Sequence, residues 1–456
     1  ALKACRPELK CRATACLART DDDDIGHETP PASVTFSKQN LAKPALYCHN
    51  DIINKRNITN YSNFFRSVTE LRGGEMVSSR NMPKQSEKTH RKVQSITRSE
   101  APQRLLELLY RVHYVVGMKV QDTLRTDDRL DRHQIAVLWI IRSEGVDGRS
   151  IPRKYVEKQL TGWYDISSSA ISKAIRALAS KDINLLNITE HPSSGREKLI
   201  ELTPAGLRFM QQMTRNGSAM CDWFLENMSQ WDEEVDVCLY IYTKVTTIFG
   251  KMIDQERIDA GEPIADAAPQ ESVLHHPLTS QMAERSFSWE ELPSVPQEYA
   301  TLMQLNIFFP IHYKAGNKLE QIMRSSSGLS RQQIIILLLI FAEGEGQSTM
   351  PRKRIETALS SWLEITSSSV SKAIRSLTTE DMALLTINES PESGREKTVQ
   401  LTIKGGEFIR RLTASGVDYL QGLVDQLSDD EIAMVAHIFS RTYDIFESYP
   451  GPFRVQ

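Results

Sequence analysis

Two stretches of the chain place several small hydroxyl side chains directly before a lysine and an arginine that are three residues apart. The first, residues 167–178, reads SSSAISKAIRAL, and the second, residues 366–377, reads TSSSVSKAIRSL. Short side chains at the start of a helix let its backbone N–H groups approach an anion closely, and the two cations add attraction. The pattern predicts non-covalent binding of phosphate groups by these residues: Ser167, Ser168, Ser169, Ser172, Lys173 and Arg176, and Thr366, Ser367, Ser368, Ser371, Lys372 and Arg375.

Lys173 and Arg176 share one face of the expected helix because residues three apart are neighbours on a helix surface. The apolar residues are expected to form the inward face: Ala170, Ile171, Ala174, Ile175 and Leu178. The alternative is a solvated helix face with a hydroxyl cap, and for one stretch alone that alternative would be favoured. The letter-for-letter repetition of SKAIR in both stretches favours binding instead.

Two further basic groups accompany each stretch. Arg153-Lys154 and Arg352-Lys353 precede it and are candidate phosphate anchors, which would position a nucleic acid without specifying its sequence. The turn SGREK follows it and carries Arg196 with Lys198, and again Arg395 with Lys397. An arginine at such a tip suits a narrow minor groove of DNA, whereas the alternative is an ordinary polar turn.

These groups recur because the chain contains an internal repeat. Shifted by 199 residues, the segment 151–206 aligns without a gap to 350–405, and 29 of 56 positions are identical. Since the period has the size of a domain, the repeat indicates duplication of a whole domain rather than a solenoid.

Each copy shows the same order of expected elements. A long amphipathic helix is followed by a second helix, a short helix after Pro152 or Pro351, a hydroxyl-capped helix, a two-stranded hairpin and two closing helices. Pro310 is expected to start or kink the long helix of copy two. The expected helices are 103–125, 132–143, 168–181, 204–230 and 232–252 in copy one, and 296–324, 331–343, 367–380, 405–427 and 429–446 in copy two.

The fold class predicted from this order is mainly α with small β-hairpin wings, in two tandem winged helix-turn-helix domains that form an intrachain pseudo-dimer. Residues 1–100 lack helical or strand periodicity and are expected to be a disordered or artefactual extension. Domain one is assigned to 101–253, a Pro-, Ala- and acid-rich linker to 254–296, domain two to 297–448 and a tail to 449–456.

Residues 103–252 and 296–446 resemble the MarR family of bacterial regulators, in the order of their elements and in the junctions LTPAG (202–206) and LTIKG (401–405). The resemblance implies a dimer built from the terminal helices, here a covalent pseudo-dimer. It also implies a possible small-molecule effector near five aromatic residues, although core packing is the favoured interpretation of them: His113, Tyr114, Trp139, His312 and Tyr313.

The predicted function is a transcription regulator that binds double-stranded DNA at an imperfect palindrome, with helices in the major groove and wing arginines in the minor groove. The copies differ at Lys181/Glu380 and Ser193/Glu392, so copy one is expected to bind phosphate more tightly. Two alternatives are a winged-helix protein–protein adaptor without DNA binding and a plasmid replication initiator.

Several classes of function are not expected. The chain has no glycine-rich phosphate loop, nucleophile motif or metal-ligand spacing, so we expect no enzyme, no cofactor and no metal. Its longest apolar run is too short for a membrane helix, and a cytoplasmic, nucleoid-associated bacterial protein is expected. The net charge of −3 leaves room for local basic patches. Cys221 and Cys238 are expected to be small buried residues rather than a redox switch.

Overall fold

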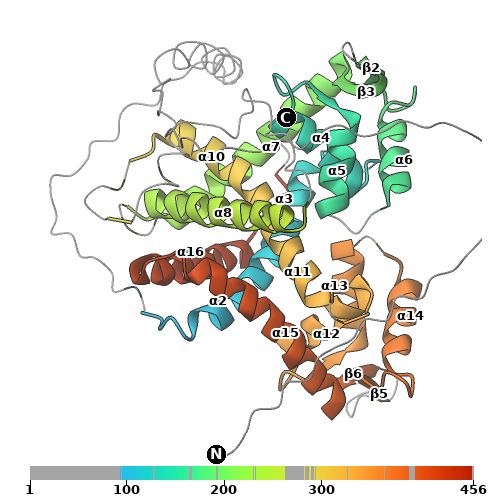
Figure 1. The fold of residues 1–456 in the computed structure, drawn as a ribbon, viewed down its shortest axis with the longest axis vertical. Coiled ribbons are helices and arrows are strands. Elements are labelled where there is room, and N and C mark those ends of the chain that lie inside the picture. The colour runs from blue at the N-terminus through green and yellow to red at the C-terminus, as the bar shows by residue number, and fades with distance from the viewer. Residues whose placement is uncertain are drawn as a thin grey trace, which may run out of the picture. The chain divides into compact units, whose positions relative to one another are not determined.

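A computed structural model describes residues 93, 95–126, 129–163, 167–191, 194–229, 231, 233–261, 282, 287–288, 292, 294–325, 327–363, 365–389 and 396–453. Most of the predicted N-terminal extension lies outside these residues. The predicted fold class is confirmed for the two copies of the repeat, which are mainly helical and contain one small antiparallel sheet each (Figure 1).

Copy one begins with α2 (Ala101–Arg111), a π-helical turn η1 (Val112–Val116) and α3 (Gly117–Leu124), which together form the predicted long helix. Its remaining elements are α4 (Arg132–Glu144), β1 (Ser150–Pro152), α5 (Arg153–Trp163), α6 (Ser168–Leu178), β2 (Leu186–His191), β3 (Ser194–Leu202), α7 (Pro204–Met228) and α8 (Glu234–Asp259). The helix α8 runs past the expected end at residue 252, because helix-compatible residues continue to Gly261, whose φ is +68°.

Copy two repeats the series with α10 (Gln297–Pro310), η2 (Ile311–Gly316), α11 (Asn317–Ser325), α12 (Arg331–Glu343), β4 (Thr349–Pro351), α13 (Arg352–Leu363), α14 (Ser367–Leu377), β5 (Leu385–Glu389), β6 (Lys397–Leu401), α15 (Ile403–Val424) and α16 (Asp429–Glu447). The expectation for Pro310 is wrong in part, because the helix starts at Gln297. The π-helical turn after Pro310 also occurs after Arg111 in copy one, so proline is not its cause.

Each copy has one strand more than predicted. The sheet orders are β1-β3-β2 and β4-β6-β5, all antiparallel, so the expected hairpin is the larger part of a three-stranded sheet. The additional strand pairs Ile151 with Ile200, and both side chains are buried. Three residues are too few for an alternating pattern to predict a strand.

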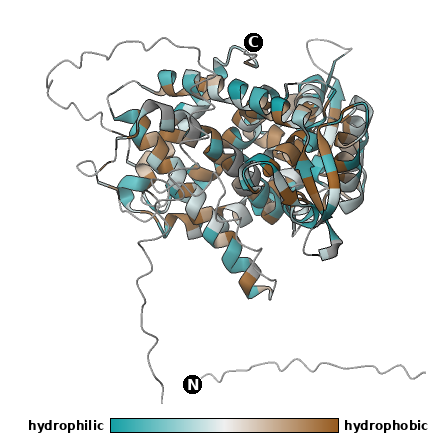
Figure 2. Ribbon diagram, turned by 90° about the horizontal axis from the view of Figure 1, so that it is seen from above, coloured by the Kyte–Doolittle hydropathy of each residue, from teal (hydrophilic) through white to brown (hydrophobic). Residues whose placement is uncertain are grey.

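The two copies are joined by their first and last helices. The α2 helix of copy one packs against α15 and α16 of copy two, α10 packs against α7, and α8 lies beside α16 (Figure 1). Brown and teal residues alternate along individual helices in Figure 2, as expected for helices with one buried face. Cys221 and Cys238 are fully buried in this core, which confirms their predicted packing role, and burial raises the pKa of both thiols.

At the centre of this contact, η1 and η2 cross at two histidines. The rings of His113 and His312 stack with centroids 4.6 Å apart, and His113 Nδ1 donates to the His312 carbonyl oxygen at 2.9 Å. Each ring lies directly on a glycine of the other copy: a Cβ atom on Gly117 would overlap His312, and one on Gly316 would overlap His113. The crossing therefore requires residues without a side chain at both positions.

A buried charge network surrounds this crossing. Glu320 accepts from Tyr114 OH at 2.7 Å and from Arg331 Nε at 2.6 Å, and lies 3.8 Å from His113 Nε2. Burial alone would raise the pKa of Glu320, but Arg331 and His113 outweigh it and lower this pKa to about 2. Burial and the neighbouring His113 hold the pKa of His312 well below its usual value, so His312 is neutral.

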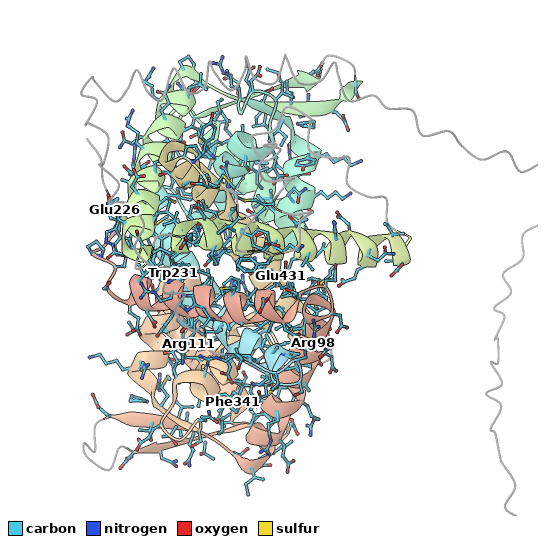
Figure 3. The ribbon with its side chains drawn as sticks, turned by 90° about the vertical axis from the view of Figure 1, so that its left-hand side faces the viewer. Arg98, Arg111, Glu226, Trp231, Phe341 and Glu431 are labelled. Atoms are coloured by element: carbon cyan, nitrogen blue, oxygen red, sulfur yellow. The ribbon has the colours of Figure 1, made fainter. Side chains whose placement is uncertain are left out.

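The winged part of each copy, from α4 to β3 in copy one and from α12 to β6 in copy two, is called the lobe. Each lobe also contacts the first long helix of the other copy. Trp362 of lobe two stacks on Tyr114 at 4.9 Å, and its carbonyl oxygen accepts from Arg132 Nη1 at 2.8 Å. In lobe one, Arg142 donates to Asn306 Oδ1 at 3.1 Å. Copy two has Phe341 at the position of Arg142 (labelled in Figure 3), so the two lobes are anchored by different chemistry.

Five aromatic residues were candidates either for core packing or for binding an effector. Those whose side chains the structure describes are core residues. His113, Tyr114, Trp139 and His312 are all buried, which confirms the packing interpretation for them. A cavity of about 20 Å³ lies beside His113, Tyr114 and Glu320, and such a volume holds about one water molecule. The side chain of Tyr313 is not among those described.

Residues next to the predicted domain boundaries also take part in the fold. Arg98, within the predicted extension, donates to the carbonyl oxygens of Val424 and Leu427 at 3.1 and 2.6 Å and so caps the end of α15. Within the predicted linker, Met282 is buried and Phe287 packs on Tyr240 with ring centroids 5.5 Å apart. In the described part of the chain, the helices are too short or too polar to cross a membrane.

We predict that Gly117→Ala and Gly316→Ala each destabilise the protein by about 1–3 kcal/mol, because the added methyl group overlaps a histidine ring held between two helices. The melting temperature, measured by calorimetry, should fall by several degrees. Gly250→Ala is the matched control, since a Cβ atom there meets nothing within 4 Å. This control should raise stability by roughly 0.5–1 kcal/mol, and equal effects at all three positions would contradict the prediction.

We predict that Glu320 makes the protein sensitive to acid. Its pKa is lowered in the folded state, so its contribution is complete above its unfolded pKa near 4.5 and is lost as the pH falls toward about 2. The shift corresponds to about 3 kcal/mol. Glu320→Gln, which introduces the residue found at the matching Gln121, should lower stability at pH 7 and flatten its decline between pH 4.5 and 2. Parallel unfolding curves of variant and native protein across this range would argue against the assignment.

Candidate nucleic-acid interface

The predicted binding residues lie mainly on α6 and α14. Ser167 is the N-cap of α6 and accepts from the Ala170 N–H, while Thr366 is the N-cap of α14 and accepts from the Ser369 N–H. The capping role of the hydroxyl cluster is therefore confirmed in both copies. Both helices end earlier than expected, at Leu178 and Leu377.

The inward face of each helix is apolar and spaced by three or four residues. Ile171, Ala174, Ile175 and Leu178 are buried in α6, and Val370, Ala373, Ile374 and Leu377 are buried in α14. The expectation that Ala170 belongs to this face is wrong, because Ala170 is exposed. It lies one residue before the first buried position and so falls outside the stripe.

The opposite face carries the predicted cations and most of the hydroxyl groups. Lys173 and Arg176 are exposed on α6, and Lys372 and Arg375 are exposed at the same positions of α14. Ser167, Ser168 and Ser169 are exposed at the start of α6, as are Thr366, Ser367 and Ser368 at the start of α14. Each helix thus presents a positively charged face with small hydroxyl residues at its N-terminus.

Two of the predicted residues in copy one instead contact each other inside the lobe. Arg153 Nη2 donates to Ser172 Oγ at 2.5 Å, and both Arg153 Nε and Ser172 Oγ donate to Glu157 Oε1, at 2.9 and 3.0 Å. We call this three-residue cluster the brace, because it ties the start of α5 to the middle of α6. Arg153 and Ser172 are only partly exposed, and their contact with DNA stays a prediction.

Copy two has the same brace, formed by Arg352, Glu356 and Ser371. Arg352 Nη2 donates to Ser371 Oγ at 2.5 Å, Arg352 Nε donates to Glu356 Oε1 at 2.8 Å, and Ser371 Oγ donates to Glu356 Oε1 at 3.2 Å. The two glutamates were not among the residues predicted from the sequence. An arginine followed four residues later by a glutamate in both copies was the available signal.

The neighbouring lysines are free of the brace. Lys154 and Lys353 are exposed next to Arg153 and Arg352, on the first turns of α5 and α13. They are therefore better placed than the arginines for phosphate contacts from this part of each lobe.

The wings are described only in part. Lys198 is exposed on β3 and its Nζ lies 3.0 Å from Glu190 Oε1 across the hairpin, while Lys397 stands opposite Glu389 in the register of β5 and β6. Arg196 belongs to β3 by its backbone, but its side chain is not among those described. Arg395 lies outside the described residues.

The wing is fixed to the closing helix by a threonine in each copy. Thr203 caps α7 by accepting from the Gly206 N–H at 2.9 Å, and its hydroxyl group donates to the Asn184 carbonyl oxygen at 2.6 Å. Thr402 caps α15 in the same way and donates to the Ala383 carbonyl oxygen at 2.7 Å. Thr203 and Thr402 are the threonines of the LTPAG and LTIKG junctions, so these hydrogen bonds are what fixes each junction.

The comparison with known families agrees with this geometry. A family model described as a winged helix DNA-binding domain matches the chain twice, at residues 130–206 and 329–405. Both ends of the two matches are 199 residues apart (329 − 130 and 405 − 206), which is the period of the internal repeat. The chain therefore contains two winged-helix domains in tandem, a class of domain that binds DNA. No curated protein is similar enough to this chain to count as a match.

We predict that the brace positions α6 for binding. Removing a carboxylate from a DNA-binding surface should by charge alone tighten binding, whereas loss of the brace should weaken it. Glu157→Ala is therefore expected to lower affinity for duplex DNA about tenfold, the scale of a lost charge-assisted hydrogen bond. Asp182→Ala removes the same charge from an exposed position just after α6. Fluorescence anisotropy should show equal or tighter binding for this control, and tighter binding by Glu157→Ala would refute the positioning role.

Proposed function

We propose that the chain is a non-enzymatic, MarR-like transcription regulator that binds double-stranded DNA as a single-chain pseudo-dimer. The observation that carries the proposal is the matched construction of α6 and α14. Both have a hydroxyl N-cap, a buried apolar stripe and an exposed lysine and arginine. Both helices lie on the right-hand side of Figure 1, which supports binding to one duplex.

In this proposal the two helices enter successive major grooves. Half-sites of helix-turn-helix dimers lie about one helical turn apart, roughly 10 base pairs from centre to centre. The exposed residues of α6 and α14 nearly match, so the target is an imperfect palindrome. Arg196 and Arg395 contact the adjacent minor grooves, where narrow A·T-rich segments attract arginine. Binding to chromosomal DNA places the protein in the cytoplasm with the nucleoid.

The two lobes are proposed to contribute unequally. Lys181 follows α6 and is exposed, whereas copy two has the exposed Glu380 at the matching position. A lysine near phosphate adds affinity and a glutamate subtracts it, and salt weakens both effects. Copy one is therefore the tighter half of the proposed interface.

The proposed effector requires a change in the structure. The site near His113 and Tyr114 holds about 20 Å³ in this conformation, and a drug-sized ligand needs a pocket of roughly 300 Å³ or more. An effector that binds there would have to separate η1 from η2 or move lobe two from Tyr114. Such a movement would change the spacing of α6 and α14, which is how binding could be regulated.

The wing arginines test the proposal. Arg196→Ala and Arg395→Ala should each weaken binding about tenfold, the scale of one lost nucleic-acid contact, with the larger loss for Arg196→Ala. Lys251→Ala removes the same charge from an exposed position on α8 and should leave affinity unchanged. The measurement is a gel-shift series across salt concentrations. Native affinity of both arginine variants at every salt concentration would count against DNA binding through the wings.

A further inference from the structure

The contact between α8 and α16 buries two carboxylate groups. Glu234 at the start of α8 is fully buried, and Glu431 near the start of α16 is 3% exposed. The two helices lie side by side in Figures 1 and 3, and Figure 3 labels Glu431 and Trp231 along the line between them. A carboxylate in such a place is stable only when cations and hydrogen-bond donors surround it.

Two cations close to Glu234 come from copy two. His437 Nε2 lies 3.1 Å and Arg441 Nε lies 3.5 Å from Glu234 Oε1. Both are one helical turn apart on α16, so they reach the same carboxylate.

The donors around Glu431 include two from copy one. Tyr240 OH donates to Glu431 Oε1 at 2.6 Å, and Lys244 Nζ lies 3.6 Å from the same oxygen. The start of each helix thus meets the middle of the other, so α8 and α16 run antiparallel. The two ion pairs lie at different positions of this contact and are not related by the repeat, because Glu234 corresponds to Ala433 and Glu431 to Asp232.

The internal repeat shows what each copy would offer to a second copy of itself. Shifted by 199 residues, His437 and Arg441 correspond to Cys238 and Tyr242 of copy one. By the same shift, Tyr240 and Lys244 correspond to Phe439 and Tyr443 of copy two. The four donor groups named above are therefore replaced at the matching positions of the acid's own copy, by a thiol and a phenol for Glu234 and by a phenylalanine and a phenol for Glu431.

Pairing of like copies would bury these acids among the wrong groups. In a pair of two copies one, Glu234 would lose both cations and face a thiol and a phenol. In a pair of two copies two, Glu431 would lose Lys244 and face a phenylalanine and a phenol. Removing one partner of a buried ion pair is strongly destabilising, so both like pairs are disfavoured.

We infer that the surface formed by α8 and α16 is built to accept only the unlike copy, so that every pair contains one copy one and one copy two. The occupant is the other copy of the same chain, since the linker keeps it at high local concentration. The inference rests on the proposed pseudo-dimer and adds to it. Each DNA-binding unit has two non-equivalent lobes in a fixed combination, and chains do not assemble through like copies.

The test gives copy two the residues of copy one. In the full chain, His437→Cys with Arg441→Tyr should lower the melting temperature by about 5 °C or more, the scale of a broken buried ion pair. Glu234→Ala introduces the residue that copy two has at Ala433. Added to the double variant it should raise the melting temperature again. In the native chain it should lower it, by less than the double variant does, because the cations left behind, His437 and Arg441, are partly exposed. The same sign of effect in both backgrounds would overturn the inference.

The second ion pair keeps the test decisive if the double variant does not fold. Lys244→Tyr should lower the melting temperature, and adding Glu431→Gln should recover part of the loss while keeping an oxygen for the Ser428 N–H. Lys251→Tyr, an exposed position on the same helix, is the control and should change little. A Lys244→Tyr variant as stable as this control would also overturn the inference.

The mass of the native chain is the last measurement. Sedimentation should give 51.7 kDa, one chain, and an assembly of two chains joined through like copies would contradict the inference. None of these measurements involves DNA. A failure to bind DNA would therefore refute the proposed function while leaving the pairing result intact, and the reverse also holds.

Discussion

The closeness of η1 and η2 is the constraint on which the rest of the structure depends. Each histidine ring occupies the space that a side chain would fill at the other copy's glycine. The ring of each π-helical turn therefore packs directly on the backbone of the other turn. Each lobe follows this crossing directly, through α3 and α4 in copy one and through α11 and α12 in copy two. The spacing of α6 and α14 therefore depends in part on a contact in which neither helix takes part.

The elements that recur in both copies could be predicted from the sequence. The hydroxyl caps at Ser167 and Thr366, the apolar stripe of α6 and the order of the helices follow from local patterns that repeat every 3.6 residues or mark a helix start. The short strand β1 could not be predicted, because three residues show no period and its partner β3 is nearly fifty residues away.

The exposed cations of the candidate interface could be predicted from the sequence, whereas the brace could not. Lysine and arginine are recognisable by residue type alone, so the exposed cations Lys173 and Arg176 follow from the sequence. Glu157 could not be predicted in the same way, because an acid on a basic surface is ordinarily a solvated residue, and its hydrogen bond with Ser172 of α6 follows only from the fold. Contacts between copies, such as Trp362 on Tyr114, depend on the arrangement of distant helices and have no signature in the sequence.

Fusion of two unlike copies frees the protein from a rule that governs symmetric dimers. In a homodimer one codon change alters the DNA-binding helices of both subunits together, so its DNA target must remain palindromic as the target sequence evolves. Here a substitution in α6 leaves α14 untouched, and the difference between Lys181 and Glu380 already marks the two lobes apart. Under the proposed function, each lobe could therefore change together with its own half of the DNA target, and the two unlike lobes would bind an asymmetric target in one orientation.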